Sequence, residues 1–228
     1  MNKKLTELQS KILKPLTREQ ILVVSHNGGH ALVSAVAGSG KTVTLIHRIL
    51  FLLSSGVESE KILVVMYNRD VKISFEARLQ KACSFFGLKA PKIYTYHSLG
   101  RTVCENLSEN GHIDKCTYRL KDYEYWPDLQ KALDHAKMLV DAEYSSEELC
   151  NLGSEFVFEF SGFIERWKGD LLQPDEVLGS IDYESVPWAI KKAYGKFEEL
   201  RQEARYRTFA DMIYDPAVAI RNSRELNN

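Results

Sequence analysis

Apolar and polar positions alternate with two different periods over the first hundred residues. Short apolar runs rich in β-branched residues predict three buried strands, at Ala31–Ala37, Ile62–Tyr67 and Ile93–Tyr96. The segments that follow them repeat apolar residues at helical spacing and predict three helices, at Lys41–Ser55, Asp70–Cys83 and Ser98–Leu107. Strands and helices joined by such short connections favour a parallel sheet with helices on its faces.

The ends of the predicted helices carry residues that suit them. Gly56 is expected to close the first helix, and Asp70 to favour the positive N-terminal end of the second. Ser98 is expected to cap the third helix. Each predicted helix therefore begins soon after a predicted strand ends.

The second half of the chain has a mainly helical periodicity, from about Lys121 to Asn222. Glycines and prolines interrupt this periodicity at Gly153, Gly169, Pro174, Gly179 and Pro187. The three tryptophans, Trp126, Trp167 and Trp188, all lie in this half and are expected to pack between helices. The whole pattern predicts an α/β unit with an attached helical subdomain.

Composition supports a globular chain. Of the 228 residues, 44% are hydrophobic and 27% are charged, which leaves ample apolar material for a packed core. The apolar runs fall far short of the roughly 20 residues that span a bilayer. Polar residues follow Lys3 and Lys4, where a signal peptide would be apolar. We therefore expect a cytoplasmic protein with no membrane contact.

The cysteines suggest neither a metal site nor a disulfide framework. They form no C-x-x-C pair and have no histidine neighbour at metal-ligand spacing. A cytosolic chain of this size rarely contains disulfides. We therefore interpret all four as ordinary thiols: Cys83, Cys104, Cys116 and Cys150.

Charge is divided unevenly between the two halves. Residues 1–101 contain 15 Lys and Arg against 6 Asp and Glu, whereas residues 102–228 contain 15 against 25. The halves therefore have balances of +9 and −10, which the formal net charge of −1 conceals. The split fits a basic surface for a polyanion in the first half and, equally, two separately solvated modules.

A glycine-rich segment follows the first predicted strand. Its sequence, AVAGSGKT, matches the phosphate-loop pattern except that Ala35 replaces the first glycine. The two glycines allow backbone N–H groups to point at phosphate oxygens, and the following helix adds its positive end. Lys41 is expected to reach the β- and γ-phosphates, as the candidate catalytic residue, and Thr42 to ligate Mg²⁺. The candidate nucleotide-binding residues of the loop are Ala37, Gly38, Ser39, Gly40, Lys41 and Thr42.

The loop by itself leaves several interpretations open. A glycine turn that merely precedes Lys-Thr is the structural alternative. As a nucleotide site, the loop fits a small-molecule kinase, a transporter ATPase or a helicase. The neighbouring segments decide between these classes.

Five further segments share a pattern. They are LTREQ at 16–20, LIHRI at 45–49, VVMYNRDVKISFEARL at 64–79, TYHSL at 95–99 and FIERWKGDLLQPDE at 163–176. Together with the phosphate loop and the segment 194–213, they resemble the superfamily 1 DNA helicases of the UvrD/Rep/PcrA type. There they correspond to the Q motif, the helix after the phosphate loop, motif Ia, motif Ib and a segment of the helical insertion. The order and spacing fit over nearly the whole chain.

The resemblance implies a fold and cofactors. It implies part of a RecA-like ATP-binding domain at 1–110, a helical insertion at 111–205 and a return helix into the RecA-like domain at 206–228. It also implies ATP and Mg²⁺ as cofactors, with Gln20 reading adenine through its side-chain amide. From residue type alone, Thr17 and Gln20 serve equally well as a helix capping box.

The resemblance further implies that motifs Ia and Ib line a track for single-stranded DNA. An aromatic face can stack on a base, and polar side chains can contact the sugar-phosphate backbone. Packing at a strand end is the alternative for Tyr67 and Tyr96, and capping or packing is the alternative for His97. The candidate DNA-binding residues are Tyr67, Asn68, Arg69, Thr95 and His97.

Three positions depart from the family's pattern. Val43 replaces an arginine common just after Lys-Thr, which removes one expected nucleotide contact. Asp70 replaces a common lysine in motif Ia and places a negative charge beside the expected DNA path. Thr208 stands where Asp is usual.

ATP hydrolysis in this family also needs an apolar strand that ends in Asp-Glu. Asp175-Glu176 follows a proline and a helical segment, and Asp215 is followed by Pro216 instead of Glu. In the family the acidic pair lies a few tens of residues beyond the point matched by Asp211. We therefore expect this chain to be an N-terminal fragment that does not hydrolyse ATP or unwind DNA by itself.

The predicted function is that of the ATP-binding N-terminal region of a DNA helicase or translocase that moves 3′ to 5′. The expected partners are single-stranded DNA, the remainder of the helicase chain and repair or replication proteins, at the nucleoid in the cytoplasm. One alternative is a naturally short, non-catalytic relic that binds single-stranded DNA or a partner. A phosphate-loop kinase is a further alternative, which motifs Ia and Ib disfavour.

Overall fold

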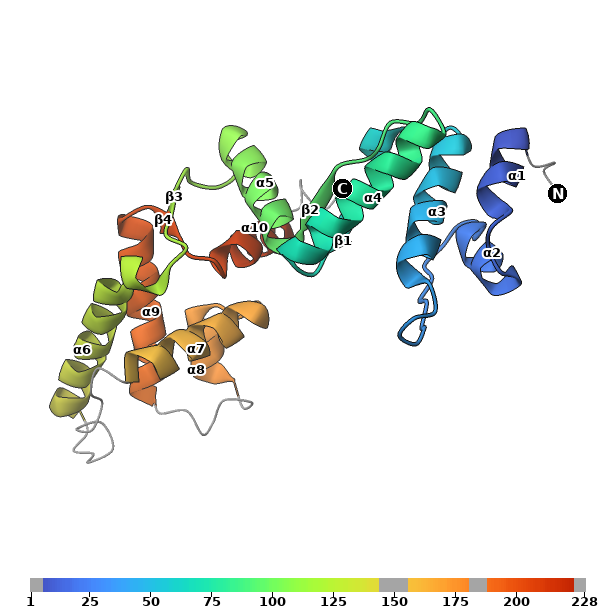
Figure 1. Cartoon of the computed structure of the whole chain (residues 1–228). Coiled ribbons are helices and arrows are strands. Elements are labelled where there is room, and N and C mark those ends of the chain that lie inside the picture. The colour runs from blue at the N-terminus through green and yellow to red at the C-terminus, as the bar shows by residue number, and fades with distance from the viewer. Residues whose placement is uncertain (1–5, 144–155, 181–187, 224–228) are drawn as a thin grey trace. The chain divides into compact units, whose positions relative to one another are not determined.

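The computed structural model of the chain describes residues 6–143, 156–180 and 188–223. The chain divides into two compact units, Met1–Tyr96 and His97–Asn228. Figure 1 labels the helices and strands of both units.

The first unit is built mainly from helices around a pair of strands (Figure 1). Strands β1 (Val64–Met66) and β2 (Ile93–Thr95) are parallel, with Val64 beside Ile93 and Met66 beside Thr95. Because the two strands are parallel and a helix connects them, this confirms the predicted strand–helix–strand pattern over 62–96. The other elements are α1 (Glu7–Leu13), α2 (Arg18–Val24), α3 (Lys41–Ser54), η1 (Ser59–Lys61) and α4 (Arg69–Phe85).

The predicted helix ends in this unit are largely confirmed. Gly56, at φ +90°, lies just after α3, and its N–H donates to the carbonyl of Leu53. Asp70 lies in the first turn of α4, where its charge favours the helix N-terminus. The core of the unit joins α1, α3, α4 and both strands through Ile12, Ile46, Ile49, Leu50, Val64, Met66, Phe75, Leu79, Cys83 and Ile93.

The expected strand at 31–37 is wrong. The segment has no strand conformation, and Leu32 is 97% exposed. A strand that is apolar on both faces needs hydrogen-bonding neighbours along its edges and helices over its faces. Among the described residues no strand lies beside this segment, because the sheet of this unit contains β1 and β2. The apolar pattern at 31–37 therefore has no sheet to join in this structure.

The second unit consists mostly of helices (Figure 1). A short parallel pair, β3 (Thr117–Tyr118) and β4 (Tyr206–Arg207), joins its beginning to its end. Its remaining elements are α5 (Tyr96–Glu109), η2 (Asp122–Glu124), α6 (Trp126–Glu143), α7 (Phe156–Gly169), α8 (Pro174–Gly179), α9 (Trp188–Glu203) and α10 (Asp211–Asn222). The predicted helical character of the second half is confirmed for the described residues. The expected cap at Ser98 is wrong, because α5 follows β2 directly and begins two residues earlier.

Aromatic side chains fill the core of the second unit. Trp167 is fully buried and packs against Phe163 and Tyr194, with ring centroids 5.6 and 5.2 Å apart. Trp126 is partly buried at the edge of the same core. Trp188 is partly exposed, so the expectation that it packs between helices holds less well for this residue.

The metal-ligating side chains of the described ranges do not gather into a site. No group of three His, Cys, Asp or Glu side chains in these ranges is placed to hold a metal ion. Cys83, Cys104 and Cys116 are free thiols, and Cys150 lies outside the described residues. None of the helices over the same ranges combines the length and the apolar composition that crossing a membrane requires.

Candidate nucleotide-binding site

The glycine-rich loop turns tightly into the N-terminus of α3. Gly38 and Gly40 have φ angles of +78° and +86°, which L side chains rarely adopt. Ser39 closes the turn between them, since its N–H and its hydroxyl both donate to the Val36 carbonyl, at 3.3 and 2.8 Å. Gly40 is the N-cap of α3, and no side chain caps this helix end. The N-terminal N–H groups of α3 are therefore available to an anion.

Lys41, the first residue of α3, folds back over the loop. Its Nζ donates to the carbonyl oxygens of Ala35 and Val36, at 3.1 and 2.8 Å. These carbonyls partly replace the solvation of the ammonium group. Thr42 follows in the first turn and is half-buried, whereas Ala37 and Ser39 are exposed. The structure therefore brings the predicted loop residues together at one helix end.

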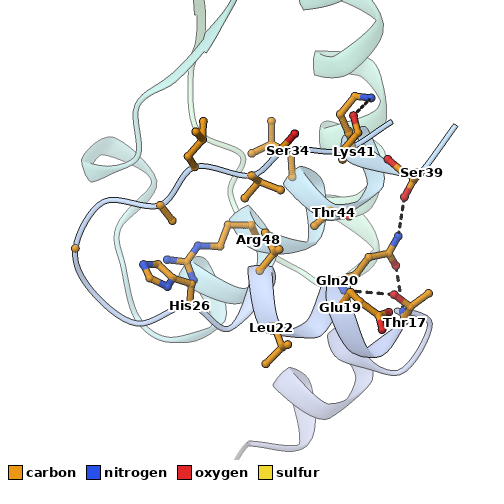
Figure 2. A pocket seen from close by; sticks show the side chains of 17 residues that line it. Thr17, Glu19, Gln20, Leu22, His26, Ser34, Ser39, Lys41, Thr44 and Arg48 are labelled. Carbon is orange, nitrogen blue, oxygen red and sulfur yellow. Dashed lines mark hydrogen bonds between the residues drawn. The ribbon is translucent and has the colours of Figure 1, made fainter. Parts of the chain in front are cut away.

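Gln20 connects α2 to this loop. Its backbone N–H donates to Thr17 Oγ1 and its Oε1 accepts from the Thr17 N–H, which completes a capping box on α2. Its Nε2 donates to the Ser39 carbonyl at 3.2 Å, as the dashed line in Figure 2 indicates. A Cβ at Gly40 would stand 2.7 Å from the same Nε2. The capping interpretation is confirmed, and the same side chain lies against the candidate phosphate loop.

A cavity of about 880 Å³ opens between α2, α3 and the segment 29–35 (Figure 2). This volume falls within the range of small-molecule sites, which are mostly apolar with a few placed polar groups. Gln20 and Lys41 lie at its border, and Leu22, Leu32 and Leu45 provide apolar surface. The cavity therefore combines an apolar wall with the glycine-rich loop and its lysine.

Arg48 of α3 also borders this cavity, although the sequence pattern does not single it out. Its Nη1 donates to the Val24 carbonyl at 2.7 Å, and burial lowers the pKa of the guanidinium. Figure 2 shows the Arg48 side chain extending toward His26, whose Nε2 is buried with no hydrogen-bond partner among the described residues. The signal for Arg48 was present in LIHRI, but helical spacing alone did not distinguish a cavity residue from a solvated one.

The motif Ia residues lie where β1 passes into α4. Tyr67 follows the strand and is 86% exposed, which rules out the packing alternative for this ring. Asn68 Oδ1 accepts from the Val71 N–H at 2.9 Å, so Asn68 is the N-cap of α4. Arg69 is exposed in the first turn. Because β1 and β2 are parallel neighbours, Thr95 ends β2 at the same edge of the sheet where Tyr67 follows β1.

His97 belongs to the second unit and supports the packing interpretation. Its ring stacks on Phe209, with centroids 3.6 Å apart and planes 17° from parallel. Burial lowers the pKa of its imidazole, so the ring is neutral near pH 7. Phe209 is 47% exposed, and no sequence motif points to it. The contact arises from the crossing of two segments far apart in the chain.

Six charged side chains form a buried ionic cluster in the second unit. They are Lys168, Glu198, Arg201, Arg207, Asp211 and Asp215. Lys168 Nζ lies 2.5 Å from Asp211 Oδ1 and 2.6 Å from Glu198 Oε1. Arg201 contacts Glu198 and Asp215, at 2.6 and 3.2 Å, and Arg207 contacts Asp215 at 2.8 Å. Three cations therefore balance three carboxylates and tie together α7, α9, β4 and α10.

Asp211 is the most deeply buried member of this cluster. Burial by itself would raise the pKa of its carboxyl, but Lys168 and Arg201 outweigh burial and hold the pKa below its ordinary value. For Asp215 burial prevails over Arg201, and the pKa is raised. Asp215 is thus engaged by two arginines, in agreement with its rejection as a catalytic acid.

The chain belongs to the UvrD/REP helicase N-terminal domain family, whose model matches residues 16–228. It is 23% identical over 202 residues to the ATP-dependent DNA helicase Rep of Buchnera aphidicola, covering 88% of this chain and 28% of that protein. It is 24% identical over 223 residues to the ATP-dependent DNA helicase UvrD1 of Mycobacterium tuberculosis, covering 92% and 26%. The chain therefore spans about a quarter of the length of these relatives.

A shorter match covers 68 residues of the chain. One polypeptide of an ATP-dependent helicase/nuclease of Streptococcus thermophilus is 37% identical over them, which is 30% of this chain and 6% of that protein. Helicase membership, predicted from the motifs, is thus confirmed. The roles of the individual site residues are not tested by these matches and stay predictions.

Proposed function

We propose that the chain binds ATP with Mg²⁺ as the N-terminal part of an ATP-dependent DNA helicase or translocase that moves 3′ to 5′. The observation that carries this proposal is the placement of the Gly38–Lys41 loop at the N-terminus of α3, beside a cavity of about 880 Å³. Family membership and the names of the relatives support it. The parallel pair β1–β2 supports a partial RecA-like fold, which we propose on the same grounds.

Each loop residue has a defined part in the proposed complex. The N–H groups of α3 and the loop bind phosphate oxygens, and Lys41 exchanges its two carbonyl partners for the β- and γ-phosphates. Thr42 would ligate Mg²⁺ through its hydroxyl. Gln20 already contacts the loop through Ser39, and its amide would turn toward adenine. Mg²⁺ neutralises phosphate charge when it is bound.

The exposed residues after β1 and β2 are proposed to contact single-stranded DNA. Tyr67 provides a stacking face, and Arg69 and Thr95 provide polar groups for the backbone, near the cap residue Asn68. These contacts are independent of base sequence, which suits a motor that passes over any DNA. In the second unit, His97 with its stacked Phe209 is a further candidate contact.

Hydrolysis needs an acidic pair that the 228 residues do not provide at the end of an apolar strand. We propose that the chain by itself binds nucleotide without turnover and does not unwind DNA. In the longer protein, the remainder of the helicase chain would supply the acidic pair. The alternative is a non-catalytic relic that binds single-stranded DNA or a partner. The reading frame beyond Asn228 separates the two, since a following stop codon would favour the relic.

Calorimetric titration of the chain with MgATP tests the nucleotide site. We expect saturable binding by the wild type and loss of that binding in Lys41→Ala, because the variant removes the charge at the phosphates. Lys61→Ala is the matched control, since Lys61 is an exposed lysine of the same unit, paired with Glu58. DNA binding should persist in Lys41→Ala. Equal MgATP affinity in Lys41→Ala and the wild type would refute the assigned role.

A further inference from the structure

The second unit contains a groove that the proposed function does not use. It has a volume of about 410 Å³ and lies over α9, between α6 and α8. Three lysines of α9, Lys191, Lys192 and Lys196, line it together with His135 and Trp188. We call these five residues the basic groove. None of them belongs to the phosphate loop or to motifs Ia and Ib.

Lys191 is the residue that gives the groove its chemistry. It is only 7% exposed, and it forms no ion pair or hydrogen bond with the side chains and backbone that the structure describes. A buried ammonium group is costly unless a partner of opposite charge or an acceptor accompanies it. Because Lys191 lines the groove, an anion that enters the groove can supply this partner.

The surroundings of Lys191 leave a positive excess. Lys196 is paired with Glu199, with Nζ and Oε2 2.9 Å apart, so these two charges largely cancel. Asp175 is the other carboxylate on the border, and it stands against both Lys191 and Lys192. Lys192 Nζ lies 5.3 Å from the centroid of the Trp188 ring. The groove therefore holds an aromatic side chain next to its uncompensated positive charge.

We propose that the basic groove binds a phosphodiester group of a nucleic-acid strand, with Lys191 as its main contact and Lys192 as its second. Lysine binds phosphate as a compact point charge. Trp188 offers an aromatic surface of the kind on which bases stack in sequence-independent sites. Phosphate is favoured over a peptide carboxylate because this pairing of lysines with an aromatic ring matches a backbone-plus-base ligand.

The binding test uses the whole chain and fluorescence anisotropy of labelled single-stranded and duplex DNA, over a series of salt concentrations and without nucleotide. Lys191→Gln should weaken binding several-fold and reduce the slope of log affinity against log salt by about 1. Lys115→Gln is the matched control, since Lys115 is an exposed lysine of the same unit away from the groove. The DNA form that shows the loss identifies the source of the phosphate.

Two results would overturn the proposal. One is equal affinity and equal salt slope for Lys191→Gln and Lys115→Gln with both DNA forms. The other is competition by a poly-glutamate peptide at the same charge concentration as strong as that by unlabelled DNA, which would assign the groove to acidic peptides. Because no nucleotide is present, failure of ATP binding at the Lys41 loop would leave this readout unchanged.

A stability measurement separates binding from folding. Lys191→Met should be at least as stable as the wild type in urea, because it removes a buried charge without a described partner, and its DNA affinity should fall as in Lys191→Gln. A clear loss of stability in Lys191→Met would mean that the ammonium group serves the fold, and it would overturn the proposal.

Discussion

Replacing Asp211 by Asn tests whether the buried ionic cluster holds the second unit together. Asp211 is fully buried, and its two carboxylate oxygens accept from Lys168 Nζ at 2.5 Å, from the Thr208 N–H at 2.8 Å and from the Thr208 hydroxyl at 2.7 Å. Arg201 Nε lies 3.6 Å away. Asn has nearly the same shape but no charge, so the substitution isolates the electrostatic contribution.

The size of the effect follows from the balance of charge in the cluster. With Asp211 replaced by a neutral residue, three cations face two carboxylates, and one positive charge is left buried without compensation. Breaking a buried pair by removing one partner costs about 3–5 kcal/mol. An exposed pair contributes about 0.2–1 kcal/mol, so Glu199→Gln, which breaks the exposed pair with Lys196, is the matched control.

Urea unfolding followed by tryptophan fluorescence measures this effect. All three tryptophans lie in the second unit, so the signal reports on that unit. With a slope of about 2 kcal/mol per molar urea, the midpoint should fall by about 1.5–2.5 M in Asp211→Asn and by less than about 0.5 M in Glu199→Gln. Equal small shifts in both variants would refute the view that the cluster stabilises the unit.

Three further predictions concern packing, DNA contact and pH. Gly100→Ala should destabilise the second unit by about 1–3 kcal/mol in the same urea assay, because a Cβ would stand 2.0 Å from the Met212 carbonyl oxygen; an unchanged midpoint would contradict this. Tyr67→Ala should weaken binding of single-stranded DNA about fivefold to 150-fold by anisotropy, whereas Tyr123→Ala, which removes another exposed tyrosine, should not. Burial raises the pKa of Tyr214 to about 12 from 10.0, so its contribution to stability is present below pH 10 and is lost as pH rises toward 12; urea midpoints that stay constant from pH 8 to 11 would contradict this.

Local pattern predicted the elements whose stability is decided locally. Helices α3 and α4 and strands β1 and β2 follow from the spacing of apolar residues, and the capping box of Thr17 and Gln20 follows from residue type. The segment 31–37 has an equally clear apolar pattern but is exposed, because a buried strand depends on neighbours that no local pattern supplies.

Contacts between distant segments account for the features that the sequence did not predict. Thr208, noted only as a departure from the family pattern, donates two hydrogen bonds to Asp211 in the ionic cluster. Lys168 reaches Asp211 over 43 positions in the chain, and Phe209 meets His97 through the packing of α10 near α5. Such pairings depend on the tertiary fold, so propensity and periodicity do not reveal them.

Photolabelling with 8-azido-ATP, followed by mass spectrometry of the peptides, tests the central claim that the Lys41 loop and its cavity form the nucleotide site. We predict that the label lies within residues 17–48, which border the cavity, that excess ATP prevents it and that Lys41→Ala abolishes it. Labelling in the second unit, or labelling at 17–48 that is unaffected by Lys41→Ala, would contradict the account.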